Sequence, residues 1–149
     1  MRRTLSPTME KVKSVLDVTI VKLICQLEES VYLYIDKSMP KKFRPTLVQQ
    51  LVTGLGQARK FTVKSMDLSP LFKEQKFYYL DEALTEVHNV EALLNILNDM
   101  QSVSNEAKAK FDIILADIYC NLGRLLNSFE KKLNESDTQR QADASALKF

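Results

Sequence analysis

Hydrophobic residues recur at every third or fourth position along most of this chain, which is the spacing of one face of an α-helix. The first such stripe consists of Val12, Leu16, Ile20, Leu23, Leu27 and Tyr34, and Ile24, Val31 and Ile35 widen it. Neither Gly nor Pro interrupts residues 9–38. Pro40 then disfavours the helical conformation at Met39, because its ring clashes with the residue before it. The pattern predicts one long helix over residues 9–38.

Three further segments have the same periodicity and predict helices over residues 45–64, 70–100 and 105–133. Pro45 is tolerated in the first turn of a helix. Ser69 and Ser104 precede the third and fourth segments and are typical N-cap residues. Because the links are short, consecutive helices should lie side by side and antiparallel. The predicted fold class is therefore all-α, an antiparallel up-down-up-down four-helix bundle.

The bundle is expected to form a single domain over residues 1–133, since a chain of 149 residues is long enough for one hydrophobic core. Residues 134–149 are polar and small and have no periodic stripe. A segment of this kind cannot bury enough apolar surface to order itself. We expect it to be a disordered C-terminal tail.

The composition favours long helices and excludes several classes of protein. Three Gly and four Pro are too few for the frequent turns of a β-sandwich or barrel. The two Cys cannot build a disulfide framework, and they lack the CxxC spacing of a zinc site. No apolar run reaches the roughly 18 residues that a membrane helix needs, and no apolar stretch follows Arg2 and Arg3 as in a secretory signal. We expect a cytoplasmic protein.

The charges are unevenly distributed, although 21 basic against 19 acidic side chains leave a net charge of only +2. Residues 37–76 hold nine basic and two acidic side chains, a net charge of +7. Residues 77–117 hold two basic and eight acidic ones, a net charge of −6. The near-neutral total therefore does not exclude a polyanionic partner.

The basic segment supplies the candidate nucleic-acid-binding residues in two groups. The group at the first inter-helix turn is Lys37, Lys41, Lys42 and Arg44, and the group toward the end of the second helix is Arg59, Lys60 and Lys64. A helix of about 20 residues would separate them by roughly 30 Å, so an extended polyanion fits better than a compact phosphate. The basic residues also have an explanation that needs no ligand, because cations near the end of a helix interact favourably with its dipole and basic and acidic helices attract each other.

Few residues could perform chemistry. His88 is the only histidine, and no Ser or Cys lies three or four residues from it, as a local nucleophilic pair on a helix would require. A di-iron bundle site needs Glu-x-x-His pairs on two helices, which one histidine cannot supply. Gly54 and Gly56 lie inside a predicted helix and not in a phosphate-binding loop. We therefore expect no enzyme, no catalytic residue, no metal and no cofactor.

Aromatic residues accompany the basic segment. Tyr78 and Tyr79 are adjacent on the third predicted helix, so they point in different directions and one of them should face outward. An outward aromatic side chain is a candidate contact with a partner. Close approach of another helix, or a local bend, would account for Gly54 and Gly56, each of which costs about 1 kcal/mol relative to Ala in a helix.

Two segments resemble a known family. The first is the turn from Leu33-Tyr34-Ile35 through Lys37-Ser38-Met39-Pro40-Lys41-Lys42-Phe43-Arg44, and the second is the last helix with Ile114-Leu115-Ala116-Asp117-Ile118-Tyr119 and Asn121-Leu122-Gly123-Arg124-Leu125-Leu126. Over residues 12–133 the chain resembles the bacterial four-helix bundle superfamily of the 23S rRNA intervening-sequence proteins. Within it, the chain is most similar to the accessory variability determinant (Avd) proteins of diversity-generating retroelements.

This resemblance implies an accessory protein and not a catalyst. Avd proteins form pentamers, bind nucleic acid through a basic surface and associate with the reverse transcriptase of the retroelement. The resemblance thus implies three partners, namely a reverse transcriptase, template RNA with its cDNA, and further copies of the chain. The resemblance implies a nucleic-acid-binding role only for the turn residues Lys37, Lys41, Lys42 and Arg44. The acidic third helix departs from the family, whose members are often more basic.

Two other functions stay open from the sequence. A structural protein–protein bundle without nucleic-acid binding would use its charged segments to pair with other subunits. A small enzyme would have to be centred on His88.

Overall fold

The computed structural model describes residues 15–39 and 44–146, with the side chains of residues 44–45 and 136–146 left aside. These residues form the helices α2 (Val15–Ser38), α3 (Gln49–Asp67), α4 (Lys73–Asp99) and α5 (Asn105–Ala146), and a π-helical turn, η2 (Arg44–Val48), leads directly into α3. No strand occurs in the described ranges. The prediction of an all-α protein with four helices is confirmed.

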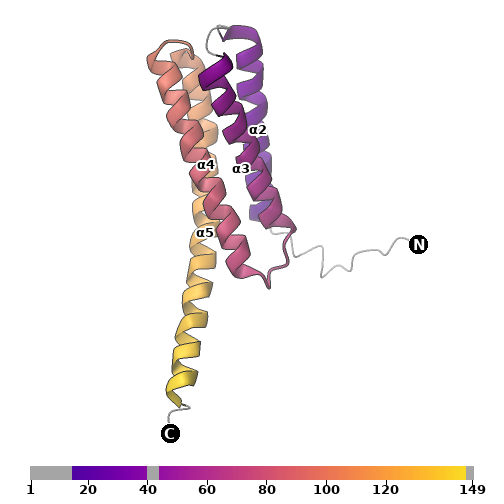
Figure 1. The fold of residues 1–149 in the computed structure, drawn as a ribbon, viewed down its shortest axis with the longest axis vertical. Coiled ribbons are helices and arrows are strands. Elements are labelled where there is room, and N and C mark those ends of the chain that lie inside the picture. The colour runs from indigo at the N-terminus through magenta and orange to yellow at the C-terminus, as the bar shows by residue number, and fades with distance from the viewer. Residues whose placement is uncertain (1–14, 40–43, 147–149) are drawn as a thin grey trace, which may run out of the picture.

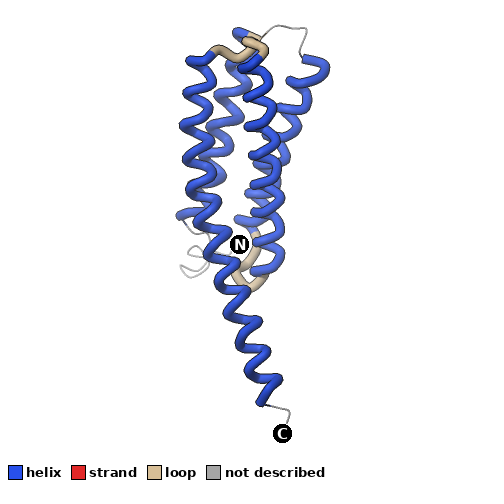
Figure 2. Tube along the Cα trace, turned by 90° about the vertical axis from the view of Figure 1, so that its left-hand side faces the viewer, coloured by secondary structure: helices blue, strands red, loops and turns tan. Residues whose placement is uncertain are grey.

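The four helices pack around a common axis (Figures 1 and 2). Helix α3 has the largest interface with α4, and the pairs α2–α3, α2–α5 and α4–α5 complete the bundle. Gly54 near the start of α3 faces Val90 near the end of α4, while Ser65 near the end of α3 contacts Lys76 near the start of α4. Helices α3 and α4 therefore run in opposite directions, as Figure 1 shows.

The core consists of the hydrophobic stripes. Its buried side chains include Ile20, Ile24, Leu27 and Val31 from α2, Leu51, Leu55 and Ala58 from α3, Leu80, Val87, Val90, Leu94 and Leu97 from α4, and Phe111, Leu115, Ile118, Leu122, Leu126 and Phe129 from α5. Burial of each large aliphatic side chain contributes about 1.5–3 kcal/mol. The periodicity of the sequence thus identified the faces that meet inside the bundle.

Several helix ends differ from the prediction. The second helix ends at Asp67 and not at residue 64, and the residues before Gln49 form η2 and not the first turn of an α-helix. Helix α4 begins at Lys73 and not at residue 70, because Ser69 and Pro70 form a tight turn. In that turn the Phe72 N–H donates to the Ser69 carbonyl at 3.0 Å, and the Leu71 N–H donates to the Ser69 hydroxyl at 3.3 Å. Proline is favourable both at the second position of a turn and in the first turn of a helix. The dipeptide Ser69-Pro70 therefore did not distinguish a turn from a helix start.

The last helix is the larger correction. The predicted boundary at residue 133 is wrong, since α5 continues to Ala146 and projects beyond the other three helices (Figure 1). Residues 134–146, expected in a disordered tail, are helical in the structure. An apolar stripe in a sequence reflects burial of one helix face, and the sequence has no such stripe after Leu133 from which a helix could be predicted. Residues 9–14 and 147–149 lie outside the described residues.

A hydroxyl group fixes one end of the bundle. The Tyr34 hydroxyl on α2 donates to the Ser102 carbonyl at 3.1 Å and accepts from the Ser104 N–H at 3.0 Å, so it binds both sides of the α4–α5 turn. That turn contains Gln101 at φ 60°, in a left-handed position that glycine usually occupies after a helix. Ser104 caps α5 through a hydrogen bond of 3.1 Å from the Ala107 N–H, as predicted.

A buried lysine fixes the other end. Lys76 of α4 is only 2% exposed, and its ammonium donates to the carbonyls of Ser65 and Leu68 at the end of α3. The ring of Phe129 on α5 lies 6.0 Å from Nζ. Burial lowers the pKa of Lys76, and the charges of Asp17 on α2 and of Asp67 act in the opposite direction. One cation therefore interacts with all four helices.

One glycine has a packing role and another has none. A Cβ atom at Gly54 would lie 3.0 Å from Cγ2 of Val90, whereas a Cβ atom at Gly56 would meet nothing within 4 Å. The side chain of Val90 is fully buried, and a β-branched residue in a helix has little rotamer freedom with which to move aside. Gly54 thus permits the close approach of α3 and α4.

We predict opposite effects for alanine at these two glycines. Gly56→Ala should raise the free energy of unfolding by about 0.5–1 kcal/mol, because alanine loses less backbone entropy on folding. Gly54→Ala should lower it by about 1–2 kcal/mol, because the methyl group overpacks the α3–α4 contact. Urea denaturation followed by circular dichroism measures both. Equal stabilisation by the two substitutions would contradict the close contact at Gly54.

We also predict that Lys76 makes stability depend on alkaline pH. Because its pKa is lower in the folded protein than the ordinary 10.5, folded molecules lose this proton first as the pH rises. The free energy of unfolding should therefore increase between the lowered pKa and pH 10.5. Lys76→Met should remove this increase, and at pH 7 should cost about 1–3 kcal/mol through the unsatisfied carbonyls.

Lys131→Met serves as the matched control, since Lys131 is an exposed lysine on α5. It should change neither the stability at pH 7 nor the alkaline increase. An alkaline increase that persists in Lys76→Met would assign the effect to another group.

Candidate nucleic-acid interface

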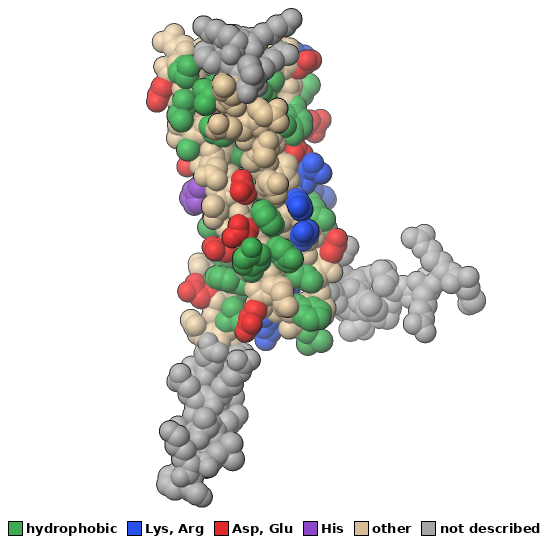
Figure 3. Space-filling model, in the orientation of Figure 1, with side chains coloured by type: hydrophobic (Ala, Val, Ile, Leu, Met, Phe, Trp, Pro, Cys, Tyr) green, Lys and Arg blue, Asp and Glu red, His purple; other side chains and the backbone are tan. Residues whose placement is uncertain are grey.

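The second group of candidate residues lies on the exposed surface of α3. Arg59, Lys60 and Lys64 are all exposed there. Figure 3 shows this face, on which Lys and Arg side chains gather along α3 above a group of hydrophobic side chains, with carboxylates on either side. Lys60 and Lys64 are four residues apart, so they lie on the same side of α3.

Arg59 is paired with a carboxylate of α2. Its Nε lies 2.9 Å from Oε1 of Glu28 on α2, and the Glu28 side chain is only 11% exposed. The second carboxylate oxygen of Glu28 accepts a hydrogen bond of 3.1 Å from the Tyr32 hydroxyl. Burial, followed by the Glu28 hydrogen bond and charge, raises the pKa of Tyr32 above 10.0. Arg59 therefore connects α3 to α2 within a polar network.

Lys64 lies beside a cluster of aromatic rings. Its Nζ is 5.6 Å from the centre of the Tyr79 ring on α4, within the range of a cation–π contact. Tyr79 stacks on Phe61 of α3 at 6.2 Å between centroids, and Tyr78 meets the edge of Tyr79 at 5.5 Å. Tyr78 is 57% exposed, while Tyr79 is half-buried. The expectation that one of the two tyrosines faces outward is confirmed.

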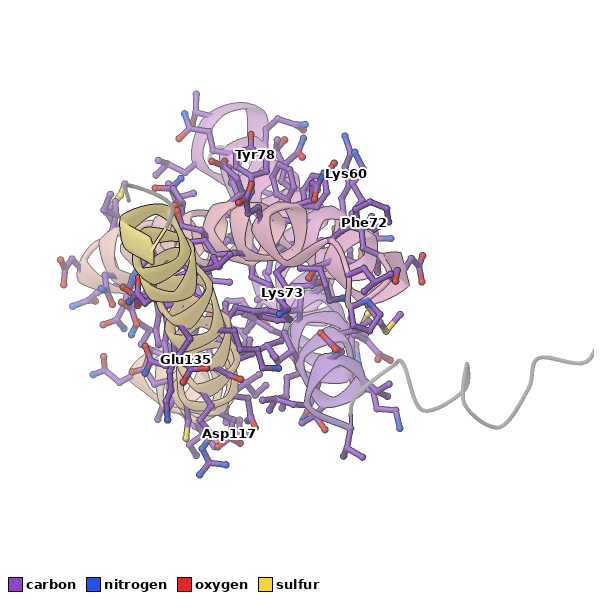
Figure 4. All side chains as sticks on the ribbon, turned by 90° about the horizontal axis from the view of Figure 1, so that it is seen from below. Lys60, Phe72, Lys73, Tyr78, Asp117 and Glu135 are labelled. Carbon is purple, nitrogen blue, oxygen red and sulfur yellow. The ribbon has the colours of Figure 1, made fainter. Side chains whose placement is uncertain are left out.

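Lys60 and Tyr78 share one side of the molecule. Viewed from below in Figure 4, they lie along the same edge of the bundle, and Phe72 follows beyond Lys60. Lys73 lies near the centre of that view, and Asp117 lies on the opposite side. Within the described part of the chain neither Lys60 nor Lys64 forms an ion pair. We call Lys60, Lys64, Phe61, Tyr78 and Tyr79 the aromatic–basic patch.

A separate groove lies between α3 and α4, nearer to the start of α3 than the aromatic–basic patch. Its volume is about 420 Å³, and it is lined by Gln49, Gln50, Thr53, Gly54, Glu86, Asn89, Ala92 and Leu93. Gly54 precedes Phe61 by seven residues, or roughly 10 Å along the helix. Side-chain amides in the lining offer both hydrogen-bond donors and acceptors.

The first group of candidate residues is only partly described. Lys37 is exposed at the end of α2. It lines a groove of about 430 Å³ between α2 and α5, together with Leu33, Glu106 and Lys110 among others. Lys41 and Lys42 lie outside the described residues, and of Arg44 only the backbone, in η2, is described. No contact in the described part joins Lys37 to the aromatic–basic patch.

The structure reduces the basic character that the sequence suggested. Of the nine basic residues in segment 37–76, Lys76 is buried and Arg59 is paired with Glu28. The turns of α4 around Tyr78 also carry the carboxylates of Glu74, Asp81 and Glu82. The patch is therefore a mixed surface with a few available cations, and not a continuous basic stripe.

His88 and the two cysteines lie in separate surroundings. His88 is exposed, its Nδ1 lies 3.2 Å from the Tyr119 hydroxyl, and the two rings stack at 4.9 Å. Burial, together with the charge of Glu91, raises the pKa of Tyr119. Cys25 is half-buried and Cys120 is exposed, and neither forms a disulfide. The described ranges contain no group of three or more potential metal ligands.

Comparison with known proteins gives no family assignment, since no family model, curated protein or solved structure matches the chain. The search for membrane-spanning helices among the described residues also found none of sufficient length and hydrophobicity.

The sequence did not reveal the surroundings of two charged residues. Glu28 follows a stripe of core residues on α2 and gives no indication that it will meet Arg59, which is 31 positions later. Lys76 reads as one more basic residue beside Lys73, yet it lies inside the bundle. Lys73 and Lys76 are three residues apart on α4 and do not point in the same direction. Leu80, four residues after Lys76, lies on the same face of the helix, and this spacing was the available hint that Lys76 is buried.

We predict that Glu28 holds the Tyr32 phenol in its protonated form. Glu28→Gln should lower the pKa of Tyr32 toward 10.0, because the substitution removes the carboxylate charge beside the hydroxyl. Alkaline titration of ¹³C-labelled tyrosine by NMR measures the shift. Glu29→Gln, a neighbouring exposed carboxylate on the same helix, is the control and should leave the Tyr32 resonance unchanged.

Proposed function

We propose that this chain is a non-enzymatic, cytoplasmic accessory protein that binds nucleic acid through the basic residues of α3 and of the α2–α3 turn. The observation that carries the proposal is the exposure of Lys60 and Lys64 beside a cluster of aromatic rings, with no ion pair to occupy them in the described part of the chain. Lysine ammonium groups contact phosphates as point charges and do not read sequence. Aromatic rings next to such cations are typical of surfaces that bind nucleic acid.

The resemblance to Avd proteins extends this proposal to partners. It favours a homo-oligomer, a pentamer in that family, that associates with a retroelement reverse transcriptase and supports mutagenic cDNA synthesis on template RNA. In this arrangement the chain would hold RNA or cDNA near the polymerase and take no part in its chemistry. The exposed turn residue Lys37, with Lys41, Lys42 and Arg44, would provide a second contact at the other end of the bundle.

A structural protein–protein bundle is the second candidate, and two exposed apolar side chains favour it. Leu33 on α2 is 52% exposed and Ile113 on α5 is 66% exposed, although scattered apolar side chains are common on monomers. Light scattering combined with a gel-shift assay separates the two functions. An oligomer that binds neither RNA nor DNA would favour the structural bundle.

We predict a salt-dependent affinity for RNA that requires the lysines of α3. A few phosphate contacts should make binding weaken by roughly tenfold between 50 and 200 mM salt, because bound cations displace counterions from the RNA. The double variant Lys60→Glu/Lys64→Glu should lower the affinity and reduce the slope of log affinity against log salt by about one per lysine. Fluorescence anisotropy with a labelled RNA measures both.

Lys131→Glu is the matched control, since it places the same charge change on an exposed position of α5. The triple variant Lys41→Glu/Lys42→Glu/Arg44→Glu tests the other end of the bundle separately. Affinity that is independent of salt, or unchanged in both multiple variants, would contradict the proposal.

A further inference from the structure

We infer that the aromatic–basic patch binds single-stranded nucleic acid, with an unpaired base stacked on the ring of Tyr78 and the flanking phosphates near Lys60 and Lys64. This inference rests on the proposed function and specifies the class of ligand at the same site.

The Tyr78 ring is available and held in place. It is 57% exposed, and its edge-to-face contact with Tyr79 at 5.5 Å supports it from one side. Tyr79 in turn stacks on Phe61 of the neighbouring helix. A ring that is already positioned loses little conformational freedom when a base stacks on it, so more of the contact energy contributes to affinity.

A lysine lies close to the rings that support Tyr78. Lys64 Nζ lies over the Tyr79 ring that Tyr78 also contacts, and Lys60 lies on the same edge of the bundle as Tyr78 (Figure 4). Proteins that bind single strands combine this arrangement of cations for the backbone with aromatic rings for the bases. The protein can therefore engage both parts of one nucleotide.

The carboxylates around Tyr78 favour a single strand over a duplex. Glu74, Asp81 and Glu82 lie within four residues of Tyr78 on α4. A duplex presents mainly phosphates to a convex helical surface, and these carboxylates would repel them. An unpaired base presents a neutral π face, so it can reach the ring while its phosphates turn toward α3.

The groove beyond the patch offers room for the adjoining nucleotides. It is lined by Gln49, Gln50, Thr53 and Asn89 among others and has Gly54 in its lining. Amides and hydroxyls can hydrogen-bond to the edges of bases that are not paired with a complementary strand.

The test compares a labelled oligonucleotide of about 12 nucleotides with its duplex of the same length. Fluorescence anisotropy should give tighter binding to the single strand. Tyr78→Ala should weaken that binding at least about fivefold, the lower end of the effect of losing one stacked base, and should leave duplex affinity unchanged. Tyr78→Phe should bind as the unchanged protein does.

Ile113→Ala is the control, because it removes another exposed apolar side chain on α5 and should have no effect. A 2-aminopurine base in the single strand supplies an independent readout, since stacking on Tyr78 should quench its fluorescence and Tyr78→Ala should restore it. Circular dichroism establishes that each variant is folded.

The outcomes separate this inference from the proposed function. Equal binding of single strand and duplex, with no change in Tyr78→Ala, overturns the inference and leaves nucleic-acid binding intact. Binding of neither ligand overturns the proposed function itself. Single-strand preference that survives Tyr78→Ala also overturns the inference, since the base would then stack elsewhere.

Discussion

The buried ammonium of Lys76 is the constraint on which the arrangement of the four helices depends. A cation taken out of water must be compensated, because an unpaired buried charge costs several kcal/mol. The charge of Lys76 is compensated by three groups. The carbonyls at the end of α3 accept its hydrogen bonds, Asp17 of α2 supplies a negative charge, and the ring of Phe129 of α5 lies beside it. These requirements are met in one register of the helices. The Tyr34 hydroxyl fixes the opposite end in the same directional manner.

The apolar core between these ends supplies most of the stability of the bundle. It contributes less to the alignment of the helices along one another. Hydrophobic burial is non-directional, and stripes of Leu and Ile along four helices would tolerate neighbouring alignments. Gly54 adds a steric condition in the middle of the bundle, because α3 and α4 approach closely only where a residue without a side chain faces Val90. Polar contacts at the ends and one glycine in between thus select the alignment that the core stabilises.

The same alignment decides what the surface offers to a partner. It buries one cation of the basic segment, Lys76, and pairs another, Arg59, with Glu28. It also brings Phe61 of α3 against Tyr79 of α4, with Tyr78 and Lys64 on either side of that ring. A segment that reads as strongly basic becomes a surface on which aromatic rings matter as much as charge.

The sequence by itself determined the helices and their inward faces, because a period of 3.6 residues records burial directly along the chain. It also indicated that Ser104 caps α5 and that one of Tyr78 and Tyr79 faces outward, since both follow from local geometry. It did not reveal the extension of α5 to Ala146, because residues 134–146 carry no apolar stripe. Only the tertiary structure decided which charges are usable. Whether Arg59, Lys64 and Lys76 meet a carboxylate, a ring or a set of carbonyls depends on residues from other helices, and no spacing within one segment contains that information.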